Sequence, residues 1–182
     1  PLYELIEGAL WDLEGRTVDT LDDLVHYSNL VGGSVGAMML PFLVTDPAQR
    51  DDLEAPARSL GIAMQITNIL RDVGEDLRRL NRVYLPLNWL DSHTLTPDDL
   101  TGASPPPGYP SLLEVTMETA EARYADSFAG IDALPFQARI GIRAAARMYR
   151  EIMNEVRALD YDNINHRAYV SLPRKLRLIV QD

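Results

Sequence analysis

The stretch 61–86, GIAMQITNILRDVGEDLRRLNRVYLP, decides how the chain folds. Its apolar residues recur at helical spacing, and nothing before the closing proline breaks a helix. At about 100° per residue, Gln65, Asn68, Asp72 and Asp76 fall on one narrow stripe of that helix. The sequence therefore predicts a long helix that carries two amides and two carboxylates along one side.

The two carboxylates of this stripe predict a metal site. Asp72 and Asp76 are one helical turn apart, where two acids repel each other unless a cation lies between them. Mg²⁺ suits such a pair, because it takes one or two carboxylates and completes its shell with water and substrate phosphates. Asn68 adds a neutral oxygen one turn back, and Gln65 can hydrogen-bond a ligand without adding charge.

A solvent-exposed helix face is the alternative interpretation, and it is the usual one for a lone DxxxD pair. Here the stripe continues toward the N-terminus into Gly61 and Ala57, which are small residues rather than lysine or glutamate. Glycine inside a helix costs up to ~1 kcal/mol relative to alanine, so Gly61 indicates a close approach by a backbone or a ligand. The pattern therefore favours the floor of a groove over a plain surface.

Composition limits the class of protein. A chain of 182 residues, 46% hydrophobic and 24% charged, is typical of one globular domain. The net charge of −10 argues against a nucleic-acid partner, and it means that a bound diphosphate needs metal ions or nearby arginines. The absence of cysteine excludes disulfides and thiolate metal sites. No apolar run reaches the ~18 residues of a membrane span.

The rest of the chain is also predicted to be helical, without β-alternating runs or internal repeats, which makes residues 1–182 a single all-α domain. We expect helices over residues 2–13, 21–31, 37–43, 51–79, 112–128 and 136–159, with a short one in the C-terminal tail. Thr20 is the expected N-cap of the second helix, and Gly130 the expected end of the fifth. The glycines of GGSVG (32–36) would weaken a helix unless packing, a kink or a ligand needs them.

Several segments together resemble one protein family. TNILRDVGED followed by NRVYLP closely resembles the second aspartate-rich motif of the phytoene/squalene synthase family, the head-to-head isoprenyl diphosphate synthases. IEGALWDLE, LVHYSNLVGGSVGAMM and HRAYVSLPRKLRL resemble further segments of this family, with Gly32 where alanine is usual. The likeness covers the whole chain and looks greatest to phytoene synthases. It implies the all-α isoprenoid-synthase bundle around a deep apolar cavity, here without the N-terminal helices.

The family resemblance also implies roles for individual residues. Asp72 and Asp76, helped by Asn68, would hold Mg²⁺ (or Mn²⁺) on the diphosphate of one substrate. Residues near the diphosphates and the carbocation would be Tyr27, Gln65, Tyr149 and Arg167. Residues that offset diphosphate charge would be Arg71 and Arg82, and those that line the prenyl channel would be Val31, Gly32, Ala57 and Gly61. From spacing alone, both tyrosines would be core residues and the C-terminal arginine a surface charge.

The reaction implied by the resemblance is a head-to-head prenyl transfer. Two geranylgeranyl diphosphates would condense through a cyclopropyl diphosphate to phytoene, as in carotenoid biosynthesis. The alternatives are a synthase of squalene, dehydrosqualene or presqualene diphosphate that uses farnesyl diphosphate, and a non-catalytic relative. Prenyl diphosphates are the expected partners, and nucleic acid is not. The apolar substrate and product imply a cytoplasmic enzyme that associates peripherally with a membrane.

The family carries two aspartate-rich motifs that face each other, and this chain matches the second. TVDTLDDL (17–24) is no substitute for the first, because it matches a different family segment. We therefore expect the chain to correspond to the C-terminal two thirds of the fold. If it is the entire protein, we expect little or no synthase activity, and an N-terminal segment or a second chain would be needed to complete the site.

Overall fold

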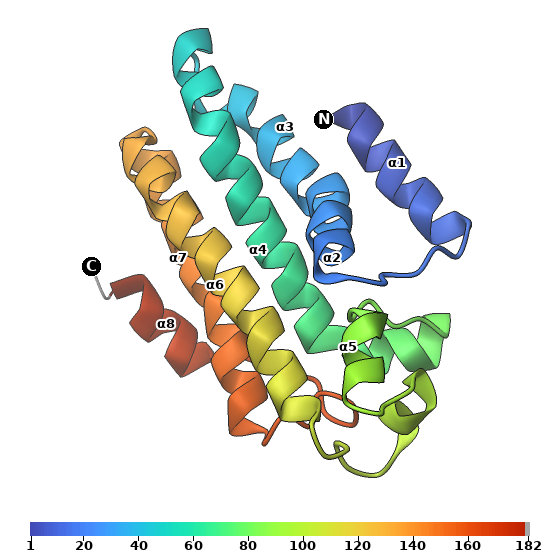
Figure 1. Cartoon of the computed structure of the whole chain (residues 1–182). Helices are drawn as coiled ribbons and strands as arrows, with labels where there is room; N and C mark the ends of the chain where they lie inside the picture. Colours follow the sequence, from blue (N-terminus) through green and yellow to red (C-terminus); the bar gives the residue numbers. More distant parts are fainter. Residues whose placement is uncertain (181–182) are drawn as a thin grey trace.

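The computed structural model describes residues 1–180, and within that range all regular secondary structure is helical, without a strand (Figure 1). The α-helices are α1 (Leu2–Leu13), α2 (Leu21–Ser28), α3 (Ser34–Leu43), α4 (Pro47–Leu80), α5 (Leu87–Ser92), α6 (Tyr109–Ala133), α7 (Phe136–Ala158) and α8 (Leu172–Val180). A π-helical turn, η1 (Asn29–Gly33), joins α2 to α3, and a 3₁₀ turn, η2 (Pro97–Thr101), precedes α6. The predicted all-α fold is confirmed.

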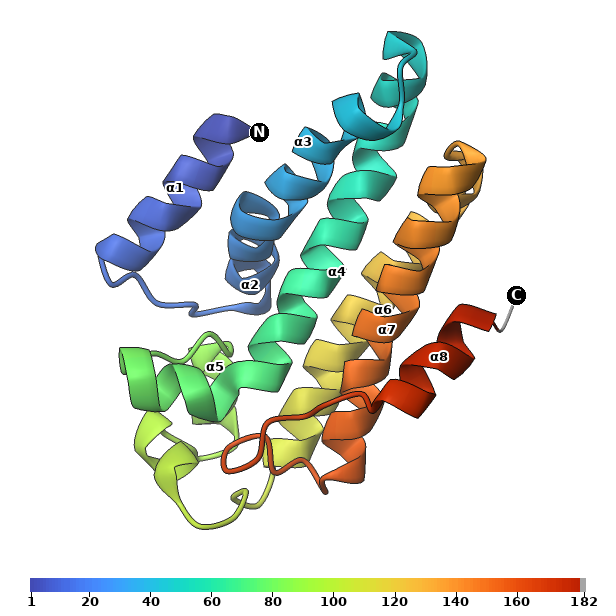
Figure 2. The ribbon, with the colours of Figure 1, turned by 180° about the vertical axis from the view of Figure 1, so that it is seen from behind.

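The long helix α4 is the axis of the bundle. It packs against α3, α6 and α7, while α1 and α8 lie at opposite edges (Figures 1 and 2). Asp46 caps its start by accepting a hydrogen bond from the Ala48 N–H at 3.0 Å, and Pro47 occupies its first position. It ends where Asn81 adopts a left-handed conformation with φ 53°. The helix therefore starts four residues before the predicted residue 51 and ends one residue after the predicted residue 79.

Two short helices begin with reciprocal caps, and the first of these is at the predicted N-cap, Thr20. The Thr20 hydroxyl accepts from the Asp23 N–H at 3.1 Å, and the Asp23 carboxylate accepts from the Thr20 N–H at 2.9 Å. Thr96 and Asp99 form the same capping box at η2. Such a cap stabilises a helix start by roughly 1 kcal/mol. The first cap fixes where α2 enters the bundle.

The glycines of η1 and α3 serve the packing of this segment against α4. Gly32 lies backbone to backbone against Gly61, and Gly36 lies against the carbonyl of Ala57. A side chain at either glycine of the first pair would overlap the backbone of the other helix. The close approach predicted for Gly61 is therefore confirmed, and the partner is a neighbouring backbone.

The prediction that the helix after residue 112 ends near Gly130 is wrong. α6 continues to Ala133, because Gly130 lies inside it, directly against the ring of Pro56 on α4. The glycine marks a close helix–helix contact rather than a helix end. Nothing in the local sequence distinguishes the two uses, since both need the absence of a Cβ atom.

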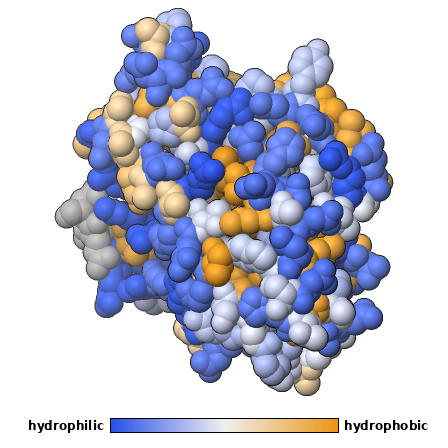
Figure 3. All heavy atoms as spheres, viewed as in Figure 1, coloured by the Kyte–Doolittle hydropathy of each residue, from blue (hydrophilic) through white to orange (hydrophobic). Residues whose placement is uncertain are grey.

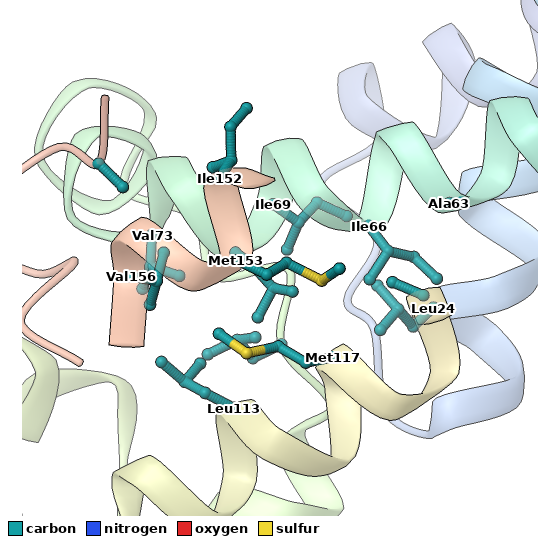
Figure 4. Close-up of a cluster of buried hydrophobic side chains, with 14 of the residues drawn as sticks. Leu24, Ala63, Ile66, Ile69, Val73, Leu113, Met117, Ile152, Met153 and Val156 are labelled. Atoms are coloured by element: carbon teal, nitrogen blue, oxygen red, sulfur yellow. The ribbon is translucent and has the colours of Figure 1, made fainter. Parts of the chain in front are cut away.

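The main core lies where α4, α6 and α7 meet (Figure 4). The buried side chains that interdigitate there include Ile66, Ile69, Val73, Leu113, Met117, Met153 and Val156. These residues occupy the sides of α4 that face its neighbours, and the sides of α6 and α7 that face α4. The polar stripe lies on the remaining side of α4, so burial of the apolar sides sets its orientation.

The segment that follows α7 is fastened to α4 by Asn163. Its side chain donates to the Leu70 carbonyl at 2.5 Å and accepts from the Tyr109 hydroxyl at 2.8 Å. Next to this anchor, Gly74 of α4 lies directly against the carbonyl of Ile164. These contacts fix the segment to the C-terminal half of α4, on the side of the helix opposite the polar stripe.

On the face seen in Figure 3, the surface is mostly hydrophilic, with hydrophobic residues exposed between the polar ones. Within residues 1–180, every helix is too short or too polar to cross a bilayer.

We expect Gly74→Ala to lower the free energy of unfolding by about 1–3 kcal/mol, because the new methyl group would meet the Ile164 backbone. Gly141→Ala is the matched control: it lies inside α7 with nothing within 4 Å of the new methyl group. That variant should gain up to about 1 kcal/mol from helix propensity. Urea unfolding measures both. Equal effects would contradict the assigned contact.

Candidate functional site

The polar stripe of α4 lines a cavity of about 260 Å³. The residues around this polar cavity are Tyr27, Gln65, Asn68, Ile69, Arg71, Asp72, Asp76, Leu80 and Tyr84. All four members of the stripe therefore face one hollow. Its walls come from α4, from α2 and from the segment that follows α4.

A second cavity, of about 350 Å³, is apolar and lies between α3, α4, α6 and α7. The four predicted channel residues, Val31, Gly32, Ala57 and Gly61, all line it. Residues that the sequence analysis did not single out include Met39, Leu40, Leu53, Met64, Ile131, Leu134 and Ile142. On α4 the lining runs from Leu53 to Asn68, about 22 Å of helix at 1.5 Å per residue.

The two cavities meet at Gln65 and Asn68, which line both of them. The Asn68 Oδ1 atom is buried and accepts no hydrogen bond from any residue of the described part of the chain. A buried oxygen without a donor is costly, and a bound cation or a ligand N–H or O–H group would satisfy it. Tyr149 of α7, another predicted site residue, lines the apolar cavity.

Asp72 is held by two arginines. Arg71 donates to its two oxygens at 2.8 and 2.5 Å, and Arg167 of the C-terminal segment donates at 2.7 Å. Burial alone would raise the pKa of Asp72, but the hydrogen bonds from both arginines outweigh it, and the pKa is lowered overall. Arg167 also approaches Glu75 at 3.2 Å. The structure therefore brings two of the predicted arginines to one of the predicted metal ligands.

Asp76 has no such partner. Its carboxylate accepts no hydrogen bond and forms no ion pair within residues 1–180. Burial raises its pKa to about 6, and the negative charges of Asp72, Glu75 and Asp12 contribute. The stripe thus contains one acid balanced by arginines and one acid whose charge is unbalanced.

Asp12, which the sequence analysis did not single out, organises the tyrosines at the rim. It accepts hydrogen bonds from the Tyr84 hydroxyl at 2.9 Å and from the Tyr27 hydroxyl at 3.1 Å. The two rings stack with centroids 5.2 Å apart. Burial raises the pKa of Tyr84 to about 12 and that of Tyr27 further, so both hydroxyls remain protonated donors at neutral pH. No spacing signal links this acid to tyrosines 15 and 72 positions away.

Arg82, the remaining predicted site residue, lies outside the lining of both cavities. Its guanidinium donates to the carbonyls of Asp12 and Arg16 at 2.5 and 2.7 Å. It also lies over the ring of Tyr84, 5.4 Å from the centroid. The structure places it behind the tyrosine rim, where it ties the end of α1 to the segment after α4.

The donor set fits a divalent cation that shares its shell with a phosphate ligand. Within residues 1–180, no three histidine, cysteine or acidic side chains form a complete metal site by themselves. Mg²⁺ needs fewer protein ligands, because it retains water and takes oxygens from substrate phosphates. The carboxylates of Asp72 and Asp76 and the unpaired Asn68 oxygen could supply that smaller set.

Comparison with known proteins gives one consistent family. The family model described as squalene/phytoene synthase matches residues 1–174. The chain is 41% identical over 177 residues to a phytoene synthase of Rhodobacter capsulatus, aligning 96% of this chain with 51% of that protein. For a phytoene synthase of Thermus thermophilus the identity is 42% over 164 residues, with 90% and 55% covered.

A solved structure gives the same family. The crystal structure of a dehydrosqualene synthase in complex with ligand matches with a TM-score of 0.86 and 36% identity, covering 98% of this chain and 62% of that one. The chain therefore has the predicted isoprenoid-synthase bundle. It spans about half the length of the curated relatives named above.

We expect Asp76→Asn to stabilise the protein at pH 8 and to have no such effect below about pH 4. Because the folded-state pKa is raised from 3.8 to about 6, the folded protein binds this proton more tightly than the unfolded chain does. Ionisation therefore reduces stability as the pH rises between these values, and asparagine removes that loss. Urea unfolding across this pH range measures it. Asp91→Asn, at an exposed position on α5, is the control, and a gain independent of pH would contradict the assignment.

Proposed function

The chain belongs to the squalene/phytoene synthase family, and we propose that it acts in a Mg²⁺-dependent prenyltransferase that condenses two geranylgeranyl diphosphates head to head to phytoene. One observation carries this proposal: an acid-lined polar cavity and an apolar cavity meet at Gln65 and Asn68 on a single helix. A prenyl diphosphate has the same two-part chemistry, with a charged head joined to a long apolar tail.

The polar cavity would take the diphosphate and its metal. Asp72, Asp76 and Asn68 would hold Mg²⁺, with Mn²⁺ as a substitute. Bound Mg²⁺ would offset the charge that develops on the diphosphate as it leaves. The raised pKa of Asp76 supports this assignment, because a cation beside it would remove the repulsion that the structure leaves unbalanced.

The arginines would share the charge of the diphosphate. Arg71 and Arg167 hold Asp72 through hydrogen bonds of 2.5–2.8 Å, and each guanidinium has a planar fork that also matches phosphate oxygens. When a cation takes Asp72, either arginine could turn its fork to the ligand. Arg82 would act more remotely, by holding the end of α1 behind the tyrosines.

The apolar cavity would take the prenyl tail. Val31, Gly32, Ala57 and Gly61 line it, and an apolar lining would keep water away from a carbocation once the site is closed. Gln65 and Tyr149 would lie near the reacting carbons, where the allylic C–O bond breaks and the double bond of the second substrate attacks. Tyr27, at the rim of the polar cavity, would lie on the diphosphate side, with its hydroxyl oriented by Asp12.

A second candidate is a synthase that uses two farnesyl diphosphates. The likeness to a dehydrosqualene synthase, at 36% identity over 98% of this chain, favours it. The two candidates differ in the tail length that the apolar cavity must hold. Both candidate reactions yield an apolar product. For this reason we propose that the protein works in the cytoplasm in peripheral contact with a membrane. A segment that carries the first aspartate-rich motif, in the same polypeptide or a second chain, would complete the metal site.

We expect Asp72→Asn and Asp76→Asn each to lower Mg²⁺-dependent diphosphate release by about 10²-fold or more, because each removes charge from the leaving-group site. The assay uses geranylgeranyl and farnesyl diphosphates, with the chain alone and with a first-motif segment supplied. Asp91→Asn, an exposed acid of similar size, should keep the parental rate. Release that survives both stripe variants would discard the metal assignment. No release from either substrate when the first-motif segment is supplied would favour a non-catalytic relative.

We expect Met39→Trp to reduce turnover of the C20 substrate more than that of the C15 substrate. Met39 lines the apolar cavity on α3, about seven residues beyond the Gly32–Gly61 contact and away from Asn68, so added bulk shortens the space for a tail. Phe42→Trp is the matched control, since Phe42 is 83% exposed and does not line the cavity. Competition between the two substrates measures the ratio of C20 to C15 turnover. An unchanged ratio would contradict the assignment of the Met39 end of the cavity to the prenyl tail.

A further inference from the structure

The helix α8 is fixed to the bundle by one side only. Arg174 donates to the buried Glu151 of α7 at 2.6 Å, and Leu178 faces the core with 8% of its surface exposed. Both views place α8 at the outer edge of the bundle, beside α7 and opposite α1 (Figures 1 and 2). Its remaining sides are therefore turned away from the protein.

An apolar stripe follows the outer side of α8. Leu172, Leu176 and Ile179 are 69%, 56% and 45% exposed. At about 100° per residue the three lie within about 60° of one another, whereas the core-facing Leu178 is about 120° from Leu172. The spacing i, i+4 and i+7 makes this a second apolar side, separate from the one that packs on the bundle.

Positive charges flank this stripe. Lys175 and Arg177 lie on either side of it, and neither forms an ion pair with any residue in 1–180. The whole chain carries a net charge of −10, so these two cations make α8 locally positive on an acidic molecule. An apolar stripe bordered by cations fits the headgroup region of an anionic bilayer, where leucines insert and basic side chains meet lipid phosphates.

The helix α1 provides an internal comparison. It also exposes apolar side chains, at Leu2, Tyr3, Ile6, Leu10 and Leu13. Residues 1–14, however, contain four acids and no lysine or arginine. An anionic surface would repel that face and attract α8, so charge rather than apolar exposure distinguishes the two.

A second copy of the chain is a poorer occupant for this stripe. Two α8 helices brought face to face would oppose cation to cation. Three exposed side chains also provide much less area than the roughly 800 Å² per partner of a stable interface. An anionic bilayer avoids both problems, because its lipid phosphates attract the two cations and its surface does not have to match the shape of the helix.

We infer that α8 is the surface by which the protein binds anionic membranes, with Leu172, Leu176 and Ile179 inserted between headgroups and Lys175 and Arg177 on lipid phosphates. The inference rests on the proposed function for the use of a membrane, where an apolar product would be released. The short helix makes the contact weak and reversible, as suits an enzyme that also takes charged substrates from water.

The test is flotation of the full chain with vesicles of phosphatidylcholine, with and without phosphatidylglycerol. We expect binding to the anionic vesicles that salt weakens, and little binding to the neutral ones. The double variant K175E/R177E should bind at least about 30-fold more weakly, since each basic residue near such a surface contributes about a factor of 5. Leu176→Ser should also lose binding. Circular dichroism should be unchanged for both, because these side chains are exposed.

The matched control is the α1 double variant L10S/L13S, which removes exposed apolar side chains from an acidic face and should bind like the parent. Equal binding to neutral vesicles, unchanged binding of K175E/R177E, or loss of binding in the α1 variant would overturn the inference. So would lipid-free self-association that Leu176→Ser abolishes, which would assign the stripe to a second copy. None of these binding experiments uses metal or prenyl diphosphate. A failure of the membrane inference can therefore be distinguished from a failure of the proposed function.

Discussion

Repulsion between two half-buried carboxylates is the constraint around which this molecule is arranged. Asp72 and Asp76 lie one turn apart on α4, where ionising both needs positive charge nearby. Arg71 and Arg167 supply positive charge to Asp72, whereas Asp76 has no positively charged partner within residues 1–180. This imbalance is unfavourable for a purely structural helix, which would gain stability from replacing the second acid by a neutral residue. Retaining it is consistent with a site whose remaining charge is met by a ligand.

The apolar half of the site depends on the packing of backbones. Because neither Gly32 nor Gly61 has a side chain, the backbones of η1 and α4 are in direct contact there. This contact fixes the position of one helix along the other. Beyond that contact, the side chains of α3 and α4 leave a cavity of about 350 Å³ instead of filling the gap. Close contact and empty space are thus neighbours on the same pair of helices. A larger residue at either glycine would separate the helices and change the cavity that they enclose.

Periodicity and local capping made part of the structure predictable, whereas contacts between distant segments were missed. The stripe on α4, the Thr20 cap and the all-α fold could be predicted because a helix fixes angles between residues close in the chain. Gly130 was misplaced as a helix end because its partner, Pro56, is remote in sequence. Asp12 was missed for the same reason, since its two tyrosine partners come from other segments. The family resemblance, rather than spacing, indicated Arg167, and its contact with Asp72 spans 95 positions.

The C-terminal segment connects the two surfaces to which we assign ligands. Asn163 fastens it to α4, Arg167 reaches Asp72, and α8 begins five residues later. The segment therefore brings positive charge to an acidic site at one end and to an exposed apolar stripe at the other, in a chain that is acidic overall. Since the anchor at Asn163 is buried and the arginine contact is at the surface, the arginine can change partners without releasing the anchor. A change of partner at Asp72 is thus compatible with a fixed position of α8, because the helix has its own attachment through Arg174 and Glu151.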